Sequence, residues 1–340
     1  MQDYACSAKP TIALCMYGLV RNADTQPTLQ RHVYRPLRSL GGTDLFLHTL
    51  LAARVGNPRS GEDRALHPTE FLKLGPLCRF TAEDQAGVDA RELLNSSMLR
   101  DYLHNLSTLL PRKHHSASFD PRHGGYDVAT YRNWMRGMYS MQRVAQLAIA
   151  HEEEGGFRYR LVASVRPDTA FLTELPRQEL TFLLQATRAR EVERMVLVAD
   201  MHHWFGVNDR FAVGTRDAMF DVHMDRLKPL KEQIQSGLAG TSEDMLCRLL
   251  RANRVRVLLA DICVVRVRAT GECSSLEFTQ NGKGGVACPA DYQLVVSVPG
   301  VNRTGSTSST WPCRRKGRSI ANTGLKHELL TTCAPGRVSA

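Results

Sequence analysis

Charged side chains follow several short apolar runs in this 340-residue sequence. Arg166 and Asp168 come directly after the run 159–165, with Pro167 between them. A proline-held carboxylate at the end of a buried strand is rigidly placed, and hard divalent cations bind carboxylate and phosphate oxygens together. Arg166 adds a planar donor fork for phosphate. The triplet predicts a diphosphate and metal site; the alternative is an Arg166–Asp168 turn interaction that is structural only.

A second acidic group begins a predicted helix at Ser242, Glu243 and Asp244. Serine is a favourable N-cap, and acidic residues in the first turn suit the helix dipole, so helix stability alone explains the group. The chemical alternative is that one of these carboxylates acts as a base on an acceptor hydroxyl.

A third polar group, Asn208, Asp209 and Arg210, precedes the apolar residues Phe-Ala-Val. A structural turn with an Asp209–Arg210 pair explains it, and substrate contact is the alternative. Asp200 ends the apolar run 195–199 and is a further candidate for substrate contact.

The apolar runs predict a parallel sheet. Residues 11–20 and 44–51 are predicted strands, and residues 25–39 between them have helical spacing, so the three form a βαβ unit. We expect a long helix over 127–154, a further helix over 242–253, and strands at 159–165, 195–199, 255–259 and 262–268. The expected fold is therefore α/β.

Ligands of open parallel sheets bind outside the carboxyl ends of the strands. The first strand delivers Gly18 and Arg21 to that edge, and the second carries Asp44 and His48. We expect these residues to converge there with the Arg166–Asp168, Asp200 and 208–210 groups.

Two stretches give weaker signals. Residues 54–130 have little periodicity, with one expected helix over 91–110 and a loop over 111–125. After about residue 275, Gly, Ser, Thr and Pro increase and the hydrophobic periodicity fades. We therefore expect one domain over 1–275 and a poorly ordered basic tail over 276–340.

Composition restricts the partners. Hydrophobic residues make up 43% of the chain and charged residues 23%, as in globular proteins, and the net charge of +10 is scattered along the sequence. Such an excess favours phosphates, nucleotides or acidic polymers. Basic and aromatic residues are not interleaved, so we expect no nucleic-acid partner.

The N-terminus and the cysteines bear on location. No apolar run approaches the roughly 20 residues of a membrane span, and the N-terminus lacks the features of a signal peptide. We expect a cytoplasmic protein, or an ER or Golgi luminal one whose N-terminal anchor is missing. Nine cysteines without a CxxC pair argue against a zinc site of that type. Reduced thiols are expected, with disulfides in the tail as the alternative.

Several nucleotide and hydrolase motifs are absent. The sequence contains no GxxxxGK[ST] loop, no GxGxxG after the first strand and no GxSxG elbow. These absences disfavour P-loop kinases, dinucleotide dehydrogenases and α/β-hydrolases.

The ordered segments resemble glycosyltransferase-like proteins of the GT-A type found in algae, protists and large viruses. The segments are ALCMYGLVRN, DLFLHTL, SVRPDTAF, VNDRFAVGTRDAM, TSEDML and CVVRVRATGE, together with the helix around 134–147. The resemblance implies a Rossmann-like GT-A fold with an open, twisted, mostly parallel sheet, helices on both faces, and a nucleotide-sugar donor at the carboxyl edge. Arg166-Pro167-Asp168 stands where these enzymes carry a metal-binding DxD motif, with Arg in place of the first Asp. Glu243-Asp244 resembles their xED motif, whose final Asp is the base in inverting members.

The expected function is glycosyl transfer from a nucleotide sugar to a hydroxyl of a glycan, protein or lipid. Asp168 would hold Mn²⁺ or Mg²⁺, and Arg21, Arg166 and the Gly18 turn would bind the diphosphate. Asp244 would be the base, with Glu243 beside it. The alternative is a non-catalytic protein that keeps the fold and binds an anionic glycan or nucleotide.

Overall fold

A computed structural model of the chain describes residues 6–21, 23–57, 62–109, 127–188, 194–200, 207–236 and 242–271. The predicted loop 111–125, the tail 276–340 and the domain boundary at 275 lie outside these residues.

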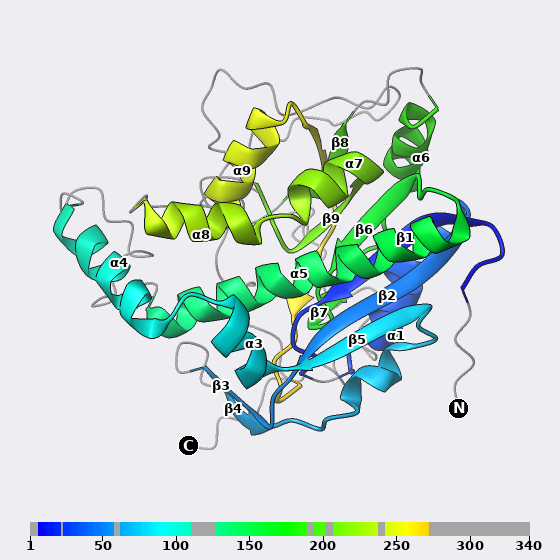
Figure 1. Cartoon of the computed structure of the whole chain (residues 1–340). Coiled ribbons are helices and arrows are strands. Elements are labelled where there is room, and N and C mark those ends of the chain that lie inside the picture. The colour runs from blue at the N-terminus through cyan, green and yellow to red at the C-terminus, as the bar shows by residue number, and fades with distance from the viewer. Residues whose placement is uncertain are drawn as a thin grey trace, which may run out of the picture.

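A seven-stranded sheet forms the centre of the molecule (Figure 1). Its order is β10-β8-β9-β6-β1-β2-β5, and every neighbouring pair is parallel except the two that β9 makes. The strands are β1 (Pro10–Tyr17), β2 (Gly42–Leu51), β5 (Arg79–Asp84), β6 (Leu161–Val165), β8 (Met195–Ala199), β9 (Phe211–Thr215) and β10 (Arg256–Ala260). The α/β class with a mostly parallel sheet is thus confirmed.

The predicted βαβ unit is present. Strand β1 is followed by α1 (Gln26–Leu29), a π-helical turn (Gln30–Tyr34) and α2 (Arg35–Arg38), and the chain then enters β2, which is parallel to β1. Pro27 and Pro36 stand in the first turns of α1 and α2. Because Pro36 has no N–H to donate, a break in the regular hydrogen-bond ladder is expected near this point.

Helices cover both faces of the sheet. Along β1, Ile12 and Leu14 face a core shared with α1, α2 and α6 (Arg177–Ala186), while Ala13 and Cys15 face the opposite core. That second core contains α5 (Val128–Gly155), α7 (Arg216–Ala218), the π-helical turn Met219–His223 and α9 (Ser242–Ala252). Since both faces are covered, the strands are apolar throughout, which is why short apolar runs revealed them.

The long helix α5 crosses the sheet over β1 and β2 (Figure 1). Asp127 caps its first turn by accepting a hydrogen bond from the Thr130 N–H, and Gly156 ends it in the left-handed region at φ 64°. The predicted helix over 127–154 is therefore confirmed. Its N-terminal half packs with α3 (Gln85–Glu92), α4 (Ser96–Leu109) and α8 (Leu227–Gln235) in a third hydrophobic cluster.

The stretch with weak periodicity differs from its prediction. The helix expected over 91–110 is present as α4, and Asn95 caps it by accepting from the Met98 N–H, whereas α3 before it was not predicted. Edge strand β5 and the hairpin of β3 (Arg54–Asn57) and β4 (Glu62–Ala65) were not predicted, nor was the 3₁₀ turn Glu70–Leu74. Strand β5 is mostly half-buried, so its sequence lacks the continuous apolar run of the central strands. The strand expected over 262–268 is the short β11 (Val264–Arg266), antiparallel to β7 (Thr169–Phe171).

The expectation of reduced thiols is wrong for part of the chain. Cys6 and Cys78 form a disulfide across 72 residues, and Cys247 and Cys263 are also disulfide-bonded, whereas Cys15 is a buried free thiol. No sequence pattern indicates the Cys6–Cys78 bond, because only the fold brings the segment before β1 beside the start of β5. Among the described helices, none has the length and apolarity to cross a membrane.

Candidate functional site

A cleft opens at the carboxyl edge of β1 and β6, where Tyr17 and Val165 end their strands. It encloses a cavity of about 130 Å³. Its walls come from the segments after β1 and β6, the β3 hairpin and the N-terminal half of α5; the polar or charged lining residues are Tyr17, Arg21, Arg54, Gln85, Asn133, Arg136, Arg166 and Asp168. Four predicted site residues, Gly18, Arg21, Arg166 and Asp168, thus line one cleft.

Gly18 makes the turn that leaves β1. Its φ of 103° is in a region that side chains with a Cβ rarely adopt. Its N–H donates to Ser140 Oγ at 2.7 Å and to the His48 carbonyl at 3.2 Å. His48 Nδ1 lies 2.7 Å from Ser140 Oγ, and its Nε2 lies 3.0 Å from Glu83 Oε1. His48 is fully buried and contacts the Gly18 turn through Ser140. The sequence had predicted that His48 would face the cleft, and it does not line the cleft.

Arg166 and Asp168 form a bidentate pair. Nε of Arg166 donates to Oδ1 at 2.9 Å, and Nη2 donates to Oδ2 at 2.7 Å. Asp168 is 2% exposed. Burial alone would raise the pKa of this carboxyl, but Arg166, with a smaller contribution from Arg21, holds that pKa well below its usual range. Asp168 is therefore ionised at neutral pH.

Arg21 links the pair to a second buried carboxylate. Its Nε lies 3.7 Å from Asp168 Oδ2, and its Nη1 donates to both oxygens of Glu62 at 2.8 and 2.7 Å. Glu62 also accepts from Arg268 Nη1 and the Ala269 N–H, both at 3.1 Å. Glu62 thus links the short strand β4 and the segment after β11 to Arg21 in the cleft lining.

Tyr17 connects the cleft to the third predicted group. Its hydroxyl lies 3.5 Å from the Asp209 carbonyl oxygen. Burial raises the pKa of Tyr17 to about 12, although Arg166 and Arg226 oppose this shift. Asp209 itself accepts a short hydrogen bond from Ser242 Oγ and lies 3.7 Å from Arg226 Nη1. The expected Asp209–Arg210 turn pair is thus replaced by an Asp209–Arg226 pair within the described contacts.

The N-terminus of α9 packs against the same loop. The Val207 N–H donates to the Glu243 carbonyl at 3.0 Å, and Ser242 contacts Asp209. The Glu243 side chain is partly exposed. Asp244 lies in the first turn of α9, and its side chain is outside the described residues.

The remaining predicted residues lie around or away from the cleft. Asp200 follows β8 at the same edge of the sheet, with its N–H donating to the Ala260 carbonyl at 2.8 Å. Asn208 is buried, and its Oδ1 accepts from the Arg210 N–H at 3.0 Å, which is the turn that the sequence suggested. Neither Asp200 nor this turn lines the cleft.

Asp44 does not belong to this edge. It pairs in register with Ala13 near the start of β1, at the opposite edge of the sheet, where it accepts from the Ser7 N–H and the Tyr159 hydroxyl. The expected convergence is therefore wrong for Asp44, because the residue stands at the beginning of its strand and not at the end.

Sequence reasoning missed several residues of the site. Arg136 and Asn133 reach the cleft from α5, a helix interpreted only as a core element. Arg226 is fully buried, and its Nε and Nη1 have no hydrogen-bond partner. Both ring nitrogens of the buried His223 also have no hydrogen-bond partner. No motif marks these positions, and Asn133 and Arg136 belong to the polar side of α5.

The cleft does not fit the expected divalent metal ion. Both oxygens of Asp168 are engaged by Arg166, and Arg21 stands 3.7 Å from one of them. Asp168 is the one acidic residue in the lining, against four arginines. Hard divalent cations need several oxygen ligands, whereas this lining offers mainly cationic donors, which suit phosphate oxygens.

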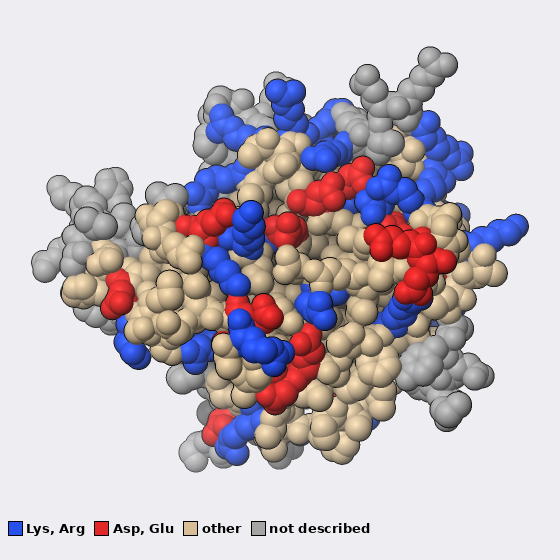
Figure 2. Space-filling model, in the orientation of Figure 1, with Lys and Arg blue, Asp and Glu red and all other residues tan. Residues whose placement is uncertain are grey.

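Charges of both signs are interspersed on the face that carries α5 (Figure 2). Among the described residues on this face, basic and acidic side chains alternate without forming a broad region of one sign. Four arginines line the cleft, and each is paired with a carboxylate: Arg21 with Glu62, Arg54 with Asp63, Arg136 with Asp89 and Arg166 with Asp168.

No protein-family model matches the chain, and no curated protein is significantly similar to it in sequence.

Proposed function

We propose that this chain is a glycosyltransferase that moves a sugar from a nucleotide-sugar donor to a hydroxyl acceptor, with arginines neutralising the leaving diphosphate. The observation that carries the proposal is the lining of the cleft, in which Arg21, Arg54, Arg136 and Arg166 accompany a single acidic residue, Asp168. The cleft stands where open parallel sheets bind their ligands. Loss of a nucleoside diphosphate develops charge on phosphate oxygens, and fixed guanidinium groups stabilise that charge.

In this proposal Arg166 is the principal diphosphate contact, and Asp168 holds it in place. The bidentate pair fixes the guanidinium plane before the donor arrives, so that binding costs little reorganisation. Arg21, held by Glu62, supplies a second cation 3.7 Å from Asp168 Oδ2. The Gly18 turn keeps the backbone after β1 close to the donor. The Mn²⁺ or Mg²⁺ expected at Asp168 has no role in these steps.

The base of the proposed reaction comes from the first turn of α9. Val207 and Asp209 bind the start of this helix to the loop before β9 and thus to the carboxyl edge. Asp244, supported by Glu243, is the residue we propose to take the proton of the acceptor hydroxyl, which would give inversion at the anomeric carbon.

The first experiment is a calorimetric titration of the full chain with a panel of nucleoside diphosphates, with and without Mn²⁺. We expect one nucleotide to bind without metal, with affinity reduced at least about 10-fold in Arg166→Met and unchanged in Arg158→Met, an exposed arginine on another surface. Strictly Mn²⁺-dependent binding would restore Asp168 as a metal ligand. No binding of any nucleotide would overturn the donor site.

A second candidate function is binding without catalysis. The closed Arg166–Asp168 pair favours it, because it occupies the carboxylate that a metal-dependent transferase would need free. Turnover decides between the two: release of nucleoside diphosphate from a nucleotide sugar, lost in Asp244→Asn, supports the transferase. Nucleotide or anionic glycan binding with no release in any condition supports the binding protein.

A further inference from the structure

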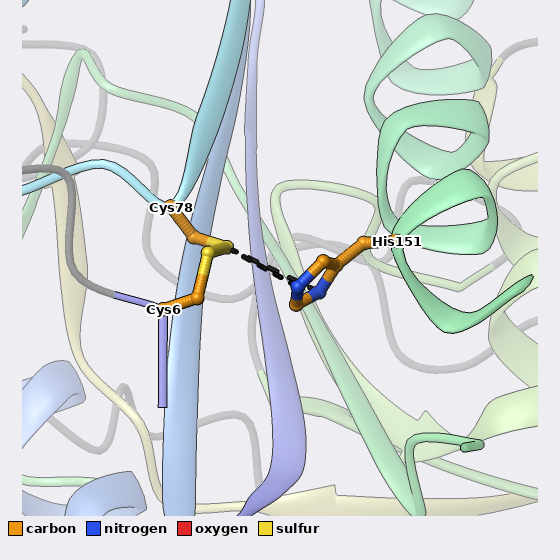
Figure 3. A group of neighbouring side chains, drawn as sticks. All are labelled: Cys6, Cys78 and His151. Carbon is orange, nitrogen blue, oxygen red and sulfur yellow. Dashed lines mark hydrogen bonds between the residues drawn. A yellow bond between two sulfur atoms is a disulfide. The ribbon is translucent and has the colours of Figure 1, made fainter. Parts of the chain in front are cut away.

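A group of soft metal ligands lies at the edge of the sheet opposite the cleft. Cys6 precedes β1, Cys78 precedes β5, and His151 stands near the C-terminal end of α5; their ligand atoms all lie within 4.8 Å of one another. Figure 3 shows the imidazole of His151 pointing toward the two sulfurs. In the part of the chain that the structure describes, no other cluster of three His, Cys, Asp or Glu side chains is placed to hold a metal ion.

The spacing of the three ligands is close to that of a zinc site. Cys78 Sγ lies 3.9 Å from His151 Nε2, and the two sulfurs are joined as a disulfide. In a tetrahedral zinc site with bonds of about 2.0–2.3 Å, ligand atoms stand about 3.5–3.8 Å apart.

A chain of hydrogen bonds through Tyr159 and Asp44 orients the His151 ring, as is usual for a metal-binding histidine. The Tyr159 hydroxyl donates to Asp44 Oδ2 at 2.6 Å, so it accepts from the His151 Nδ1–H at 2.8 Å. This tautomer, assigned from the hydrogen-bond network, leaves Nε2 unprotonated at 3.9 Å from Cys78 Sγ. Nδ1 is 4.0 Å from the same sulfur, so the ring has to turn before the Nε2 lone pair faces a metal ion between the sulfurs. Metal-binding histidines commonly donate a hydrogen bond from the N–H of their second ring nitrogen to a carboxylate, directly or through another polar group. Asp44 is fully buried and is fixed further by the Ser7 N–H.

The chemistry of the group selects the metal. Two thiolates and an imidazole prefer Zn²⁺, whereas Mg²⁺ and Mn²⁺ prefer oxygen ligands. Cys6 is exposed while Cys78 is buried, so the ion can enter from the side of Cys6. Three protein ligands leave a fourth position for water.

We propose that the reduced chain binds one Zn²⁺ through Cys6, Cys78 and His151, so that these two cysteines form a disulfide in the oxidised chain and a zinc site in the reduced one. A phosphine reductant breaks the S–S bond, takes the oxygen of one water and becomes a phosphine oxide, while each sulfur gains a proton. Zn²⁺ then displaces both thiol protons into solvent. The site is independent of the proposed glycosyl transfer.

The test measures zinc bound by the full chain after phosphine reduction and desalting, by competition with a chromogenic chelator, with Co²⁺ spectra to report thiolate ligation. We expect wild type to bind one equivalent more than Cys6→Ser or Cys78→Ser, and Cys15→Ala to keep that equivalent. The oxidised chain lacks it. We expect His151→Gln and Tyr159→Phe to weaken zinc binding about 10-fold or more.

Two results would overturn the proposal. One is equal zinc binding by reduced wild type and Cys6→Ser, which would place any bound zinc elsewhere. The other is unchanged affinity in His151→Gln, which would remove the imidazole from the site. Because His151→Gln leaves the disulfide cysteines intact, it decides the question even where a cysteine variant folds poorly, as checked by circular dichroism.

Discussion

The guanidinium of Arg166 covers both carboxylate oxygens of Asp168, at 2.9 Å from Oδ1 and 2.7 Å from Oδ2. The two residues stand two positions apart after β6, so the chain itself brings them together. The two charges offset each other, and the Arg166 side chain, which is 33% exposed, lines the cleft. This relationship is the reason for assigning the site to an anionic ligand.

Removing the Asp168 carboxylate tests this pair through stability. We expect Asp168→Ala to lower the free energy of unfolding by about 2 kcal/mol, because charged hydrogen bonds are lost. The pKa of Asp168 is depressed on folding, so its contribution is fully present above the unfolded pKa near 4 and disappears only as pH falls through the lower folded value. Urea unfolding should therefore give the same difference in unfolding free energy between wild type and Asp168→Ala at pH 8, 6.5 and 5.

The exposed Arg54–Asp63 pair is the control for this measurement. Both of its side chains are more than half exposed, so Asp63→Ala should cost less than about 0.5 kcal/mol. A difference for Asp168→Ala that grows between pH 7 and 5 would mean that the folded chain takes up a proton at Asp168 in that range, contrary to its pairing.

His223 should make the chain less stable in mild acid. It is fully buried with both ring nitrogens unpartnered, and burial, with a smaller contribution from the Arg226 cation, lowers its pKa well below the usual value. The unfolded state then binds one more proton below about pH 6.5, so stability falls with pH by about 1.4 kcal/mol per unit. His223→Leu should remove that slope, measured as urea midpoints at pH 7.5 and 5.5.

His67→Gln provides the comparison, because His67 is exposed and the substitution should leave the pH dependence as in wild type. His48, whose pKa burial also lowers, is present in both variants and cancels. An equal loss of stability in acid for His223→Leu and wild type would show that His223 is protonated in the folded chain.

The central elements were predictable because their signal is local. Strands β1, β6 and β8 are buried on both faces, so their apolar runs appear in the sequence, and α5 shows its apolar stripe over many turns. Strand β5 was missed because it lies at the edge and is mostly half-buried. The antiparallel direction of β9 was also beyond reach, since direction depends on where α6 and the following segments place the chain.

The site was predictable only where it follows a strand in sequence. Gly18, Arg21, Arg166 and Asp168 each come within a few residues of a strand end, and they do line the cleft. Arg226 was not found, because its contact with Asp209 joins residues from separate elements and no spacing rule connects them. The Cys6–Cys78–His151 group has the same character, with its three residues brought together from the starts of two strands and the end of a helix.

Two glycines should respond in opposite ways to alanine. A Cβ on Gly214 in β9 would stand 2.4 Å from the Met195 carbonyl oxygen of the neighbouring strand, so Gly214→Ala should destabilise the chain by about 3 kcal/mol. A Cβ on Gly137 in α5 meets no atom within 4 Å, so Gly137→Ala should stabilise it by about 1 kcal/mol through helix propensity. Thermal unfolding of both variants checks this, and a destabilised Gly137→Ala would contradict the open space at the cleft wall.

The buried Arg226–Asp209 pair should show strong energetic coupling. Arg226 is fully buried with its Nη1 3.7 Å from Asp209 Oδ2, so Asp209→Asn leaves a buried cation without its counter-charge and should cost about 3 kcal/mol. Arg226→Met combined with Asp209→Asn should cost less than the sum of the single changes, with a coupling of about 1–3 kcal/mol in a double-mutant cycle by urea unfolding. Arg158 and Asp217 are also 3.7 Å apart but exposed, so the same cycle there should give less than about 0.5 kcal/mol. Equal coupling in the two cycles would mean that burial does not strengthen the Arg226–Asp209 pair.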